Sequence, residues 1–286
     1  MISSTQKTAV LTGSTGGIGL EIAKILAKQG WNLALVNRSQ EKTNFQLEEL
    51  HKSHPSQEFT GFIANLMDAS DINRVAAEIR SEYTEISALY NIAGLLTDKR
   101  IMSPQNIEGH FALNTLAPYA LTQLLRNQLA TGVRNIQPSV IVNFSSSAIN
   151  AVKELDIGTL KNPESIGGLM GAYATSKTAL TAVSALMKEE LLKDGILIQV
   201  VDPGPTKTSM TGSGDGMPWY LLLLRPLLFK SAKLQAQRLI NAVESAVSEG
   251  KSGLFISEGQ QKPYPPISLD KDIQTEIKLL LDTQIQ

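Results

Sequence analysis

The sequence contains no cysteine and only three histidines. The absence of cysteine excludes disulfide bonds, thiolate metal ligands and cysteine nucleophiles. His51 and His54 lie in a polar stretch that ends at Pro55, and His110 is distant in the chain, so we expect no metal site. The net charge is only −1, which gives no electrostatic reason to expect nucleic-acid binding.

Long apolar runs are also missing. No window reaches the roughly 18 apolar residues of a membrane-spanning helix, and residues 1–7 are polar and too short for a signal peptide. The most apolar segment, 217–229, is interrupted by Arg225 and Pro226, so it is too short to cross a bilayer but long enough to lie on one. We therefore expect a cytoplasmic protein, with weak membrane-surface contact through 217–230 as an open alternative.

What the chain does contain is an alternation of short apolar runs and helical patterns. The apolar runs lie at 9–11, 33–36, 59–66, 88–93, 140–144, 196–201 and 254–257. The helical patterns lie at 17–29, about 40–53, 70–82, 105–130, 171–193 and 231–248. Apolar runs without polar alternation are typical of parallel strands that are covered on both faces. The sequence therefore predicts an α/β fold, a doubly wound (Rossmann) parallel sheet of about seven strands with helices on both faces.

The chain carries no internal repeat or linker, and its 42% hydrophobic content suffices for one large core. We therefore interpret residues 1–286 as a single domain. Two irregular stretches, 147–172 and 205–230, follow predicted strand ends, where ligands bind in such sheets, so we expect them to form substrate loops. Residues 258–286 are a C-terminal extension.

Between the first strand and the first helix, residues 12–19 read Thr-Gly-Ser-Thr-Gly-Gly-Ile-Gly. Gly13 permits a tight turn, Gly17 lets the backbone approach a pyrophosphate, and Gly19 lets the helix pack closely. The helix dipole then favours the anion. A glycine-rich turn without a ligand is the alternative, but the position after a strand and before an amphipathic helix favours a dinucleotide. The expected cofactor contacts are Gly13, Ser14, Thr15, Gly17, Ile18 and Gly19.

The end of the second strand indicates which dinucleotide is bound. A carboxylate there would hold the ribose 2′-hydroxyl of NAD, but this chain has Asn37 followed by Arg38. An amide does not repel a 2′-phosphate, and the guanidinium of Arg38 can pair with one. The pair therefore favours NADP(H) over NAD(H). Arg38 as a solvated surface cation remains the alternative, and no second basic residue lies within 13–19.

Tyr173 and Lys177 are spaced i,i+4, so they share one face of a helix. A nearby ammonium can lower a tyrosine pKa by roughly 1–3 units, which suits proton transfer. Ser146 closes the fifth apolar run, where its hydroxyl can hold a carbonyl oxygen beside Tyr173. A surface pair of no function is the alternative, and the combination with Ser146 and the phosphate loop argues against it.

These motifs resemble the short-chain dehydrogenase/reductase family, and the resemblance runs from about Lys7 to Ser257. It rests on the 12–19 loop, the Asn-Ile-Ala-Gly stretch at 91–94, Asn114, Ser146, Tyr173 with Lys177, and Pro203-Gly204.

The resemblance implies roles for the catalytic residues. Tyr173 is the proton donor in reduction and the acceptor in oxidation. Lys177 lowers the pKa of Tyr173 and binds the nicotinamide ribose, while Ser146 orients the substrate. Asn114 holds a water in a proton relay to Lys177.

The resemblance also implies the remaining cofactor contacts. Asn91, Ala93 and Gly94 are expected beside the adenosine ribose, and Asn65 with Leu66 beside the adenine. The nicotinamide end is expected to contact Pro203, Gly204, and Thr206 or Thr208.

Several departures refine the resemblance. Asn65 stands where the family usually has Asp, and Ile92 where it usually has a second Asn. The long 146–173 segment, the Asn-Arg pair at 37–38 and the stretch 113–119 look like the retinol-dehydrogenase-like branch. That branch acts on bulky apolar alcohols and aldehydes, often with NADP(H).

Two segments stay open to interpretation. The stretch 217–229, preceded by Gly212, Gly214 and Gly216, can be a lid over an apolar pocket, a membrane-docking segment, or a core or subunit contact. The tail, with a helical pattern at 270–283, is expected to cover an edge or form an oligomer contact. The family expectation is a homodimer or homotetramer through the helices at 105–130 and 171–193.

Taken together, these features predict an NADP(H)-dependent oxidoreductase that interconverts an alcohol and a carbonyl on a medium or large apolar substrate. The partner would be a small-molecule substrate, namely an apolar alcohol, aldehyde or ketone. Reduction of an activated C=C bond is an alternative, because the same tyrosine can protonate carbon. A non-catalytic, NADP(H)-binding regulatory or scaffold protein is the other, disfavoured because no catalytic position is lost.

Overall fold

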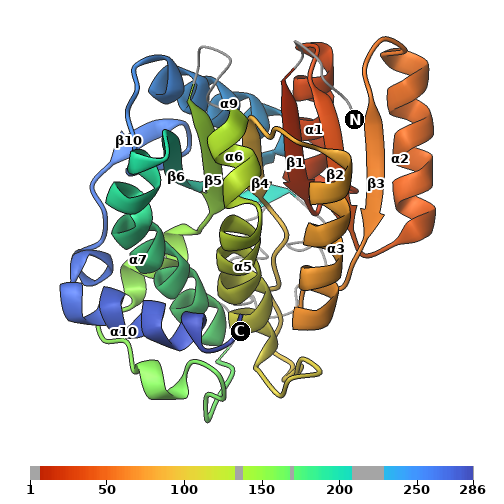
Figure 1. Ribbon diagram of the computed structural model, residues 1–286. Coiled ribbons are helices and arrows are strands. Elements are labelled where there is room, and N and C mark those ends of the chain that lie inside the picture. Colours follow the sequence, from red (N-terminus) through yellow and green to blue (C-terminus); the bar gives the residue numbers. More distant parts are fainter. Residues whose placement is uncertain (1–6, 133–137, 168–170, 208–228, 286) are drawn as a thin grey trace.

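A computed structural model describes residues 7–132, 138–167, 171–207 and 229–285. Its centre is an eight-stranded sheet of order β10-β9-β6-β5-β4-β1-β2-β3, in which every neighbouring pair is parallel except β9 and β10 (Figure 1). The strands are β1 (Thr8–Thr12), β2 (Asn32–Asn37), β3 (Phe59–Ile63), β4 (Ala88–Asn91), β5 (Ser139–Phe144), β6 (Ile196–Asp202), β9 (Leu254–Ser257) and β10 (Gln260–Lys262). Two short strands, β7 (Thr206–Lys207) and β8 (Lys230–Ser231), form a separate parallel pair.

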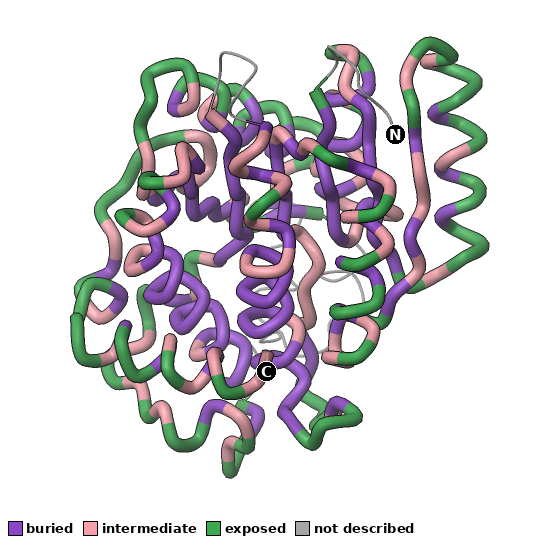
Figure 2. The backbone as a smooth tube through the Cα atoms, viewed as in Figure 1, coloured by how far each residue is buried: buried purple, intermediate pink, exposed green. Residues whose placement is uncertain are grey.

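Helices cover both faces of this sheet. Neighbouring residues of one strand face opposite sides, so Val10 of β1 packs under one helical layer while Ala9 and Leu11 pack under the other. The first layer contains α3 (Ala69–Glu82), α5 (Ala117–Leu124), α6 (Arg126–Gly132), α7 (Ala172–Lys193) and α10 (Lys271–Asp282). The second contains α1 (Gly17–Lys28), α2 (Gln40–Ser53) and α9 (Ala232–Ser248). The central strands β1, β2, β4, β5 and β6 are wholly buried between the layers (Figure 2), which confirms the predicted fold class.

The eighth strand differs from the expected count of about seven. Glu258 and Gly259 both have positive φ, 51° and 83°, and form the tight turn that folds β10 back against β9. The residues of β10 are polar and exposed, so they carry no apolar run that would mark a strand in the sequence.

The helical pattern predicted at 105–130 is divided into several pieces. They are α4 (Gly109–Phe111), a π-helical turn η1 (Ala112–Leu116), α5 and α6. The predicted loop 147–172 contains two 3₁₀ turns, η3 (Ser147–Ala151) and η4 (Ile157–Thr159), with residues 168–170 outside the described part.

The C-terminal tail packs on the first helical layer. After the 3₁₀ turn η6 (Pro266–Leu269), helix α10 lies against α7, with Ile277 and Leu281 fully buried. The hydroxyl of Tyr119 on α5 donates a hydrogen bond to Asp282 at the end of α10. The tail therefore packs on α7 and contacts α5, which belong to the two helical segments through which we expected subunits to meet. The oligomeric state stays a prediction.

Candidate active site

The predicted site residues gather at one edge of the sheet, because parallel strands run in one direction and end together. The glycine loop follows β1, Asn37 ends β2, Asn91 ends β4, Ser146 follows β5, and Pro203 follows β6. Tyr173 reaches the same edge from the first turn of α7. Sheet order rather than sequence proximity brings these groups together.

Tyr173 is the central group, and only 8% of its surface is exposed. Its hydroxyl group is hydrogen-bonded to the side chain of Ser146. Burial raises the pKa of Tyr173 to about 12; the bond from Ser146 opposes this rise and the charge of Asp202 adds to it. Tyr173 therefore carries its proton at neutral pH.

Lys177 lies one helical turn after Tyr173 and is 4% exposed. Its Nζ donates a hydrogen bond of 2.5 Å to the carbonyl of Phe144, at the end of β5. Burial lowers the pKa of Lys177 to about 7. We expected the Lys177 ammonium to lower the pKa of Tyr173, but the structure shows a raised pKa. Burial is the largest cause of the pKa shift at both residues, and Lys177 donates its hydrogen bond to the end of β5.

Asn114 lies in the π-helical turn, a type of distortion found frequently at functional sites. Its Oδ1 accepts the N–H of Leu95 at 2.8 Å, and its Nδ2 donates to the Leu95 carbonyl at 3.0 Å and to Ser176 Oγ at 3.1 Å. The amide thus holds the segment after β4 against α7. The water relay to Lys177 that the resemblance implies stays a prediction.

The glycine loop has the backbone that its sequence demands. Gly13 and Gly17 have φ of +70° and +55°, which disfavours any residue with a side chain. A Cβ on Gly19 would lie 2.3 Å from the Gly13 carbonyl oxygen, so α1 can approach the loop only because Gly19 lacks one. Helix α1 begins with Gly16 as its N-cap, without a side-chain cap or an acidic residue in its first turn. Its first N–H groups and its dipole therefore suit an anion.

Asn37 and Arg38 face different surroundings. Asn37 is 4% exposed, and its Oδ1 accepts the backbone N–H of Ser14 at 2.8 Å. Arg38 is exposed, and in the described part of the chain no hydrogen bond or ion pair occupies its guanidinium. An arginine in this state can pair with a ligand phosphate.

The other expected cofactor contacts divide into two groups. Ala93 and Gly94 are partly exposed at the edge, and Asn65 is exposed beside buried Leu66. Asn91 differs: it is 2% exposed, and its Nδ2 donates to Asn143 Oδ1 on β5 at 2.8 Å. The Asn91 side chain therefore connects two strands inside the sheet.

The segment after β6 is tightly constrained. Gly204 has φ of +67°, and a Cβ there would lie 2.7 Å from the side chain of Glu258. Thr206 is 4% exposed and donates to the Gly204 carbonyl at 2.9 Å, while the Pro203 carbonyl accepts from Gln235. Thr208 and the stretch 208–228, which includes most of the expected lid, lie outside the described residues.

Two groups near Tyr173 were missed by the sequence analysis. Asp202, 2% exposed, accepts the Gly204 N–H at 2.9 Å and the Ser257 hydroxyl at 2.8 Å, and so joins the ends of β6 and β9. The imidazole of His110 is fully buried with its ring centroid 6.4 Å from that of Tyr173. Asp202 directly precedes the Pro-Gly motif, which could have drawn attention to it. His110 had no comparable local signal.

A third missed residue is Gln46 on α2, which is 5% exposed and hydrogen-bonds Ser14 of the glycine loop. It lies on a helix of polar sequence, so no local pattern marked it as a contact of the glycine loop.

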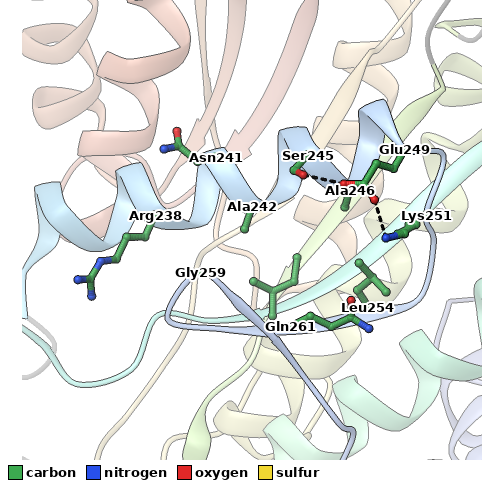
Figure 3. Close-up of a pocket in the computed structure, with 11 residues that line it drawn as sticks. Arg238, Asn241, Ala242, Ser245, Ala246, Glu249, Lys251, Leu254, Gly259 and Gln261 are labelled. Carbon is green, nitrogen blue, oxygen red and sulfur yellow. Dashed lines mark hydrogen bonds and ion pairs between the residues drawn. The ribbon is translucent and has the colours of Figure 1, made fainter.

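An open groove of about 450 Å³ lies elsewhere, between α9 and the β9–β10 hairpin (Figure 3). Glu249 lies at one end between Ser245 and Lys251, and Arg238 lies at the other. None of the residues predicted for the site lines this groove. The groove is therefore separate from the sheet edge at which Ser146 and Tyr173 lie.

The sequence profile of short chain dehydrogenases matches residues 7–217, which is most of the chain and includes the glycine loop, Ser146, Tyr173 and Lys177. The chain belongs to the short-chain dehydrogenase/reductase family. It is therefore an oxidoreductase with a nucleotide-binding fold.

Within this family the chain is similar to retinol dehydrogenases. It is 26% identical to human retinol dehydrogenase 13 over 273 residues, which cover 93% of this chain and 81% of the relative. It is 25% identical to the polyprenol dehydrogenase of Danio rerio over 283 residues, 95% of this chain and 84% of that one.

Solved structures of the family share the fold. An NADPH-bound carbonyl reductase from chicken fatty liver superposes with a TM-score of 0.68 at 19% identity, covering 91% of this chain and 99% of that structure. Across the described residues, none of the helices combines the length and the apolar character that crossing a membrane requires.

Proposed function

We propose that this short-chain dehydrogenase/reductase is an NADP(H)-dependent oxidoreductase that interconverts a carbonyl and an alcohol on a medium or large apolar substrate. The observation that carries the proposal is the buried Tyr173 hydroxyl, hydrogen-bonded to Ser146 at the strand edge. A tyrosine that keeps its proton at neutral pH is the form that carbonyl reduction requires.

The residues present fit a nicotinamide dinucleotide. The uncapped N-terminus of α1 and the glycine loop would hold the pyrophosphate. Exposed Arg38 would pair with a 2′-phosphate, and Asn37 adds no repelling charge. The bound nicotinamide would supply or accept the hydride.

The protein groups then handle the proton and the developing charge. Tyr173 donates its phenolic proton to the substrate oxygen in reduction and takes it back in oxidation. The Ser146 hydroxyl donates a hydrogen bond to the same oxygen, so the two hydroxyls stabilise negative charge as it develops there. Lys177, in the same buried space, would bind the nicotinamide ribose.

Similarity supports the substrate class and the cofactor. Two relatives are named as dehydrogenases of retinol and of polyprenol, both alcohols with long hydrocarbon chains. A structural neighbour is described as an NADPH-bound carbonyl reductase. These names motivate a screen of apolar aldehydes and ketones with NADPH.

Replacement of Tyr173 by Phe tests the proposal. Tyr173→Phe removes the proton donor and should lower turnover of the best carbonyl substrate by roughly 10²–10⁴-fold, while the Kd for NADPH changes less than about threefold. NADPH oxidation followed by absorbance, with chromatography of the alcohol product, measures the first effect, and nicotinamide fluorescence measures the second.

Tyr83→Phe is the matched control. Tyr83 is also buried, but its hydroxyl donates to Thr60 in the region of α3 and β3, away from the catalytic edge. This variant should keep wild-type turnover. Full activity of Tyr173→Phe would refute the mechanism. A product in which a C=C bond has been reduced, with the carbonyl intact, would support the alternative reaction instead. NADPH binding without turnover of any carbonyl would indicate a non-catalytic protein.

A further inference from the structure

A closed hydrogen-bond circuit joins the glycine loop to α2 through three buried side chains. Ser14, Asn37 and Gln46 are 0%, 4% and 5% exposed. Ser14 N–H donates to Asn37 Oδ1 at 2.8 Å, and Asn37 Nδ2 donates to Ser14 Oγ at 3.1 Å. Ser14 Oγ donates to Gln46 Oε1 at 3.0 Å, and Gln46 Nε2 donates to the Ser14 carbonyl at 2.9 Å.

The chemistry of the groups fixes each orientation in this circuit. A backbone carbonyl only accepts, so Gln46 must present Nε2 to Ser14 O and therefore Oε1 to Ser14 Oγ. The single hydroxyl proton of Ser14 is then directed to Gln46, which leaves Ser14 Oγ as an acceptor for Asn37. A backbone N–H only donates, so Asn37 must turn Oδ1 toward the loop.

This orientation decides what Asn37 can offer a ligand. Its Nδ2 makes one hydrogen bond, to Ser14, and retains a second N–H. Asn37 also ends β2, where a carboxylate would bind the ribose 2′-hydroxyl of NAD. With Arg38 as the next residue, the end of β2 presents donors and a cation, which suit a 2′-phosphate.

We propose that Gln46 is a positioning residue for cofactor specificity: through Ser14 it holds the Asn37 amide in the orientation that favours a 2′-phosphate over a 2′-hydroxyl. This inference rests on the proposed use of NADP(H). Without Gln46 the Ser14 hydroxyl can turn its proton to Asn37 Oδ1, which lies 3.3 Å away, and it then competes with the Ser14 N–H for that oxygen. Asn37 keeps Oδ1 toward the loop but is held less firmly, so its second N–H is less well aimed at a 2′-phosphate and the discrimination between the cofactors falls.

The test compares the Kd values of NADPH and NADH by nicotinamide fluorescence. Wild type should prefer NADPH. Gln46→Met keeps the length of the side chain and removes both polar atoms, so it should lower the NADH/NADPH ratio of Kd values by about fivefold, the loss expected for one hydrogen bond of about 1 kcal/mol. Ser14→Ala breaks the circuit at another point and should shift the ratio in the same direction, which keeps the test usable if Gln46→Met does not fold.

Leu50→Ala is the matched control, because Leu50 also belongs to α2, is 5% exposed and has no part in the circuit. It should destabilise α2 and leave the ratio of Kd values unchanged. A purely structural role for Gln46 would weaken both cofactors equally, so an unchanged ratio in Gln46→Met overturns the inference alone. A wild type that prefers NADH, or binds neither cofactor, overturns the proposed cofactor itself.

Discussion

At the scale of single residues, the burial of Lys177 in the candidate active site lowers the stability of the fold. Burial disfavours its charged form and lowers its pKa from 10.5 to about 7. The unfolded chain therefore binds one more proton than the folded chain between about pH 7 and 10.5. Lys177 destabilises the fold in this window by an amount that grows as the pH falls and is complete below about pH 7.

Replacing Lys177 by Met should therefore stabilise the protein while removing its activity. The free energy of unfolding should rise by roughly 2–4 kcal/mol near pH 7, after allowance for the lost bond to Phe144, and the gain should shrink as the pH approaches 10. Urea unfolding of wild type and variant at several pH values measures the difference. A gain that does not vary with pH would mean that Lys177 stays charged in the folded protein.

At the scale of elements, the glycine loop and α1 behave as one unit. The loop turns at Gly13, the helix begins at Gly17, and their closest approach depends on the missing side chain of Gly19. Gly16 lies in the same segment but has extended φ of −170° and free space around its Cβ position. The two glycines therefore share a helix terminus and differ in what surrounds them.

The variants Gly19→Ala and Gly16→Ala should separate these two situations. The first places a Cβ 2.3 Å from the Gly13 carbonyl oxygen, so the loop must move. We expect at least about tenfold weaker NADPH binding and a loss of roughly 1–3 kcal/mol in unfolding free energy. The second should bind NADPH within about threefold of wild type and lose less than about 1 kcal/mol. Equal behaviour of the two variants in titration and urea unfolding would contradict the close-approach argument.

At the scale of the whole molecule, the C-terminal tail belongs to the main core. Helix α10 is capped by Asp270, whose Oδ1 accepts the N–H groups of Asp272 and Ile273 at 3.0 and 3.1 Å. Its inner face adds Ile277 and Leu281 to the core beneath α3, α5 and α7. The tail thus completes one helical layer, although it lies outside the segment matched by the family profile.

Two leucines of α10 give a matched pair for this conclusion. Leu281 is fully buried, whereas Leu279 is 61% exposed. Leu281→Ala should lower the free energy of unfolding by roughly 2–5 kcal/mol, and Leu279→Ala should change it by less than about 0.5 kcal/mol. Urea unfolding measures both. Similar small effects would mean that α10 is only loosely docked in solution.

The sequence by itself determined the fold class, and it singled out the glycine loop and the set of Ser146, Tyr173 and Lys177 as the candidate site. Each of these depends on a local pattern: apolar runs and period-3.6 helical patterns, glycines or a serine at a strand end, or an i,i+4 pair on one helix. Such patterns can be recognised in the sequence because they involve residues that are close together in the chain.

Only the tertiary structure decided how those groups are partnered. Gln46 meets Ser14 across 32 positions of sequence, and Lys177 meets the Phe144 carbonyl across 33. The polar strand β10 likewise has no apolar run that marks it, and the helical pattern at 270–283 does not indicate which helices α10 packs against. These contacts depend on which elements the sheet order places side by side. The pKa shifts of Tyr173 and Lys177 also arise only in the folded protein, because burial is their main cause.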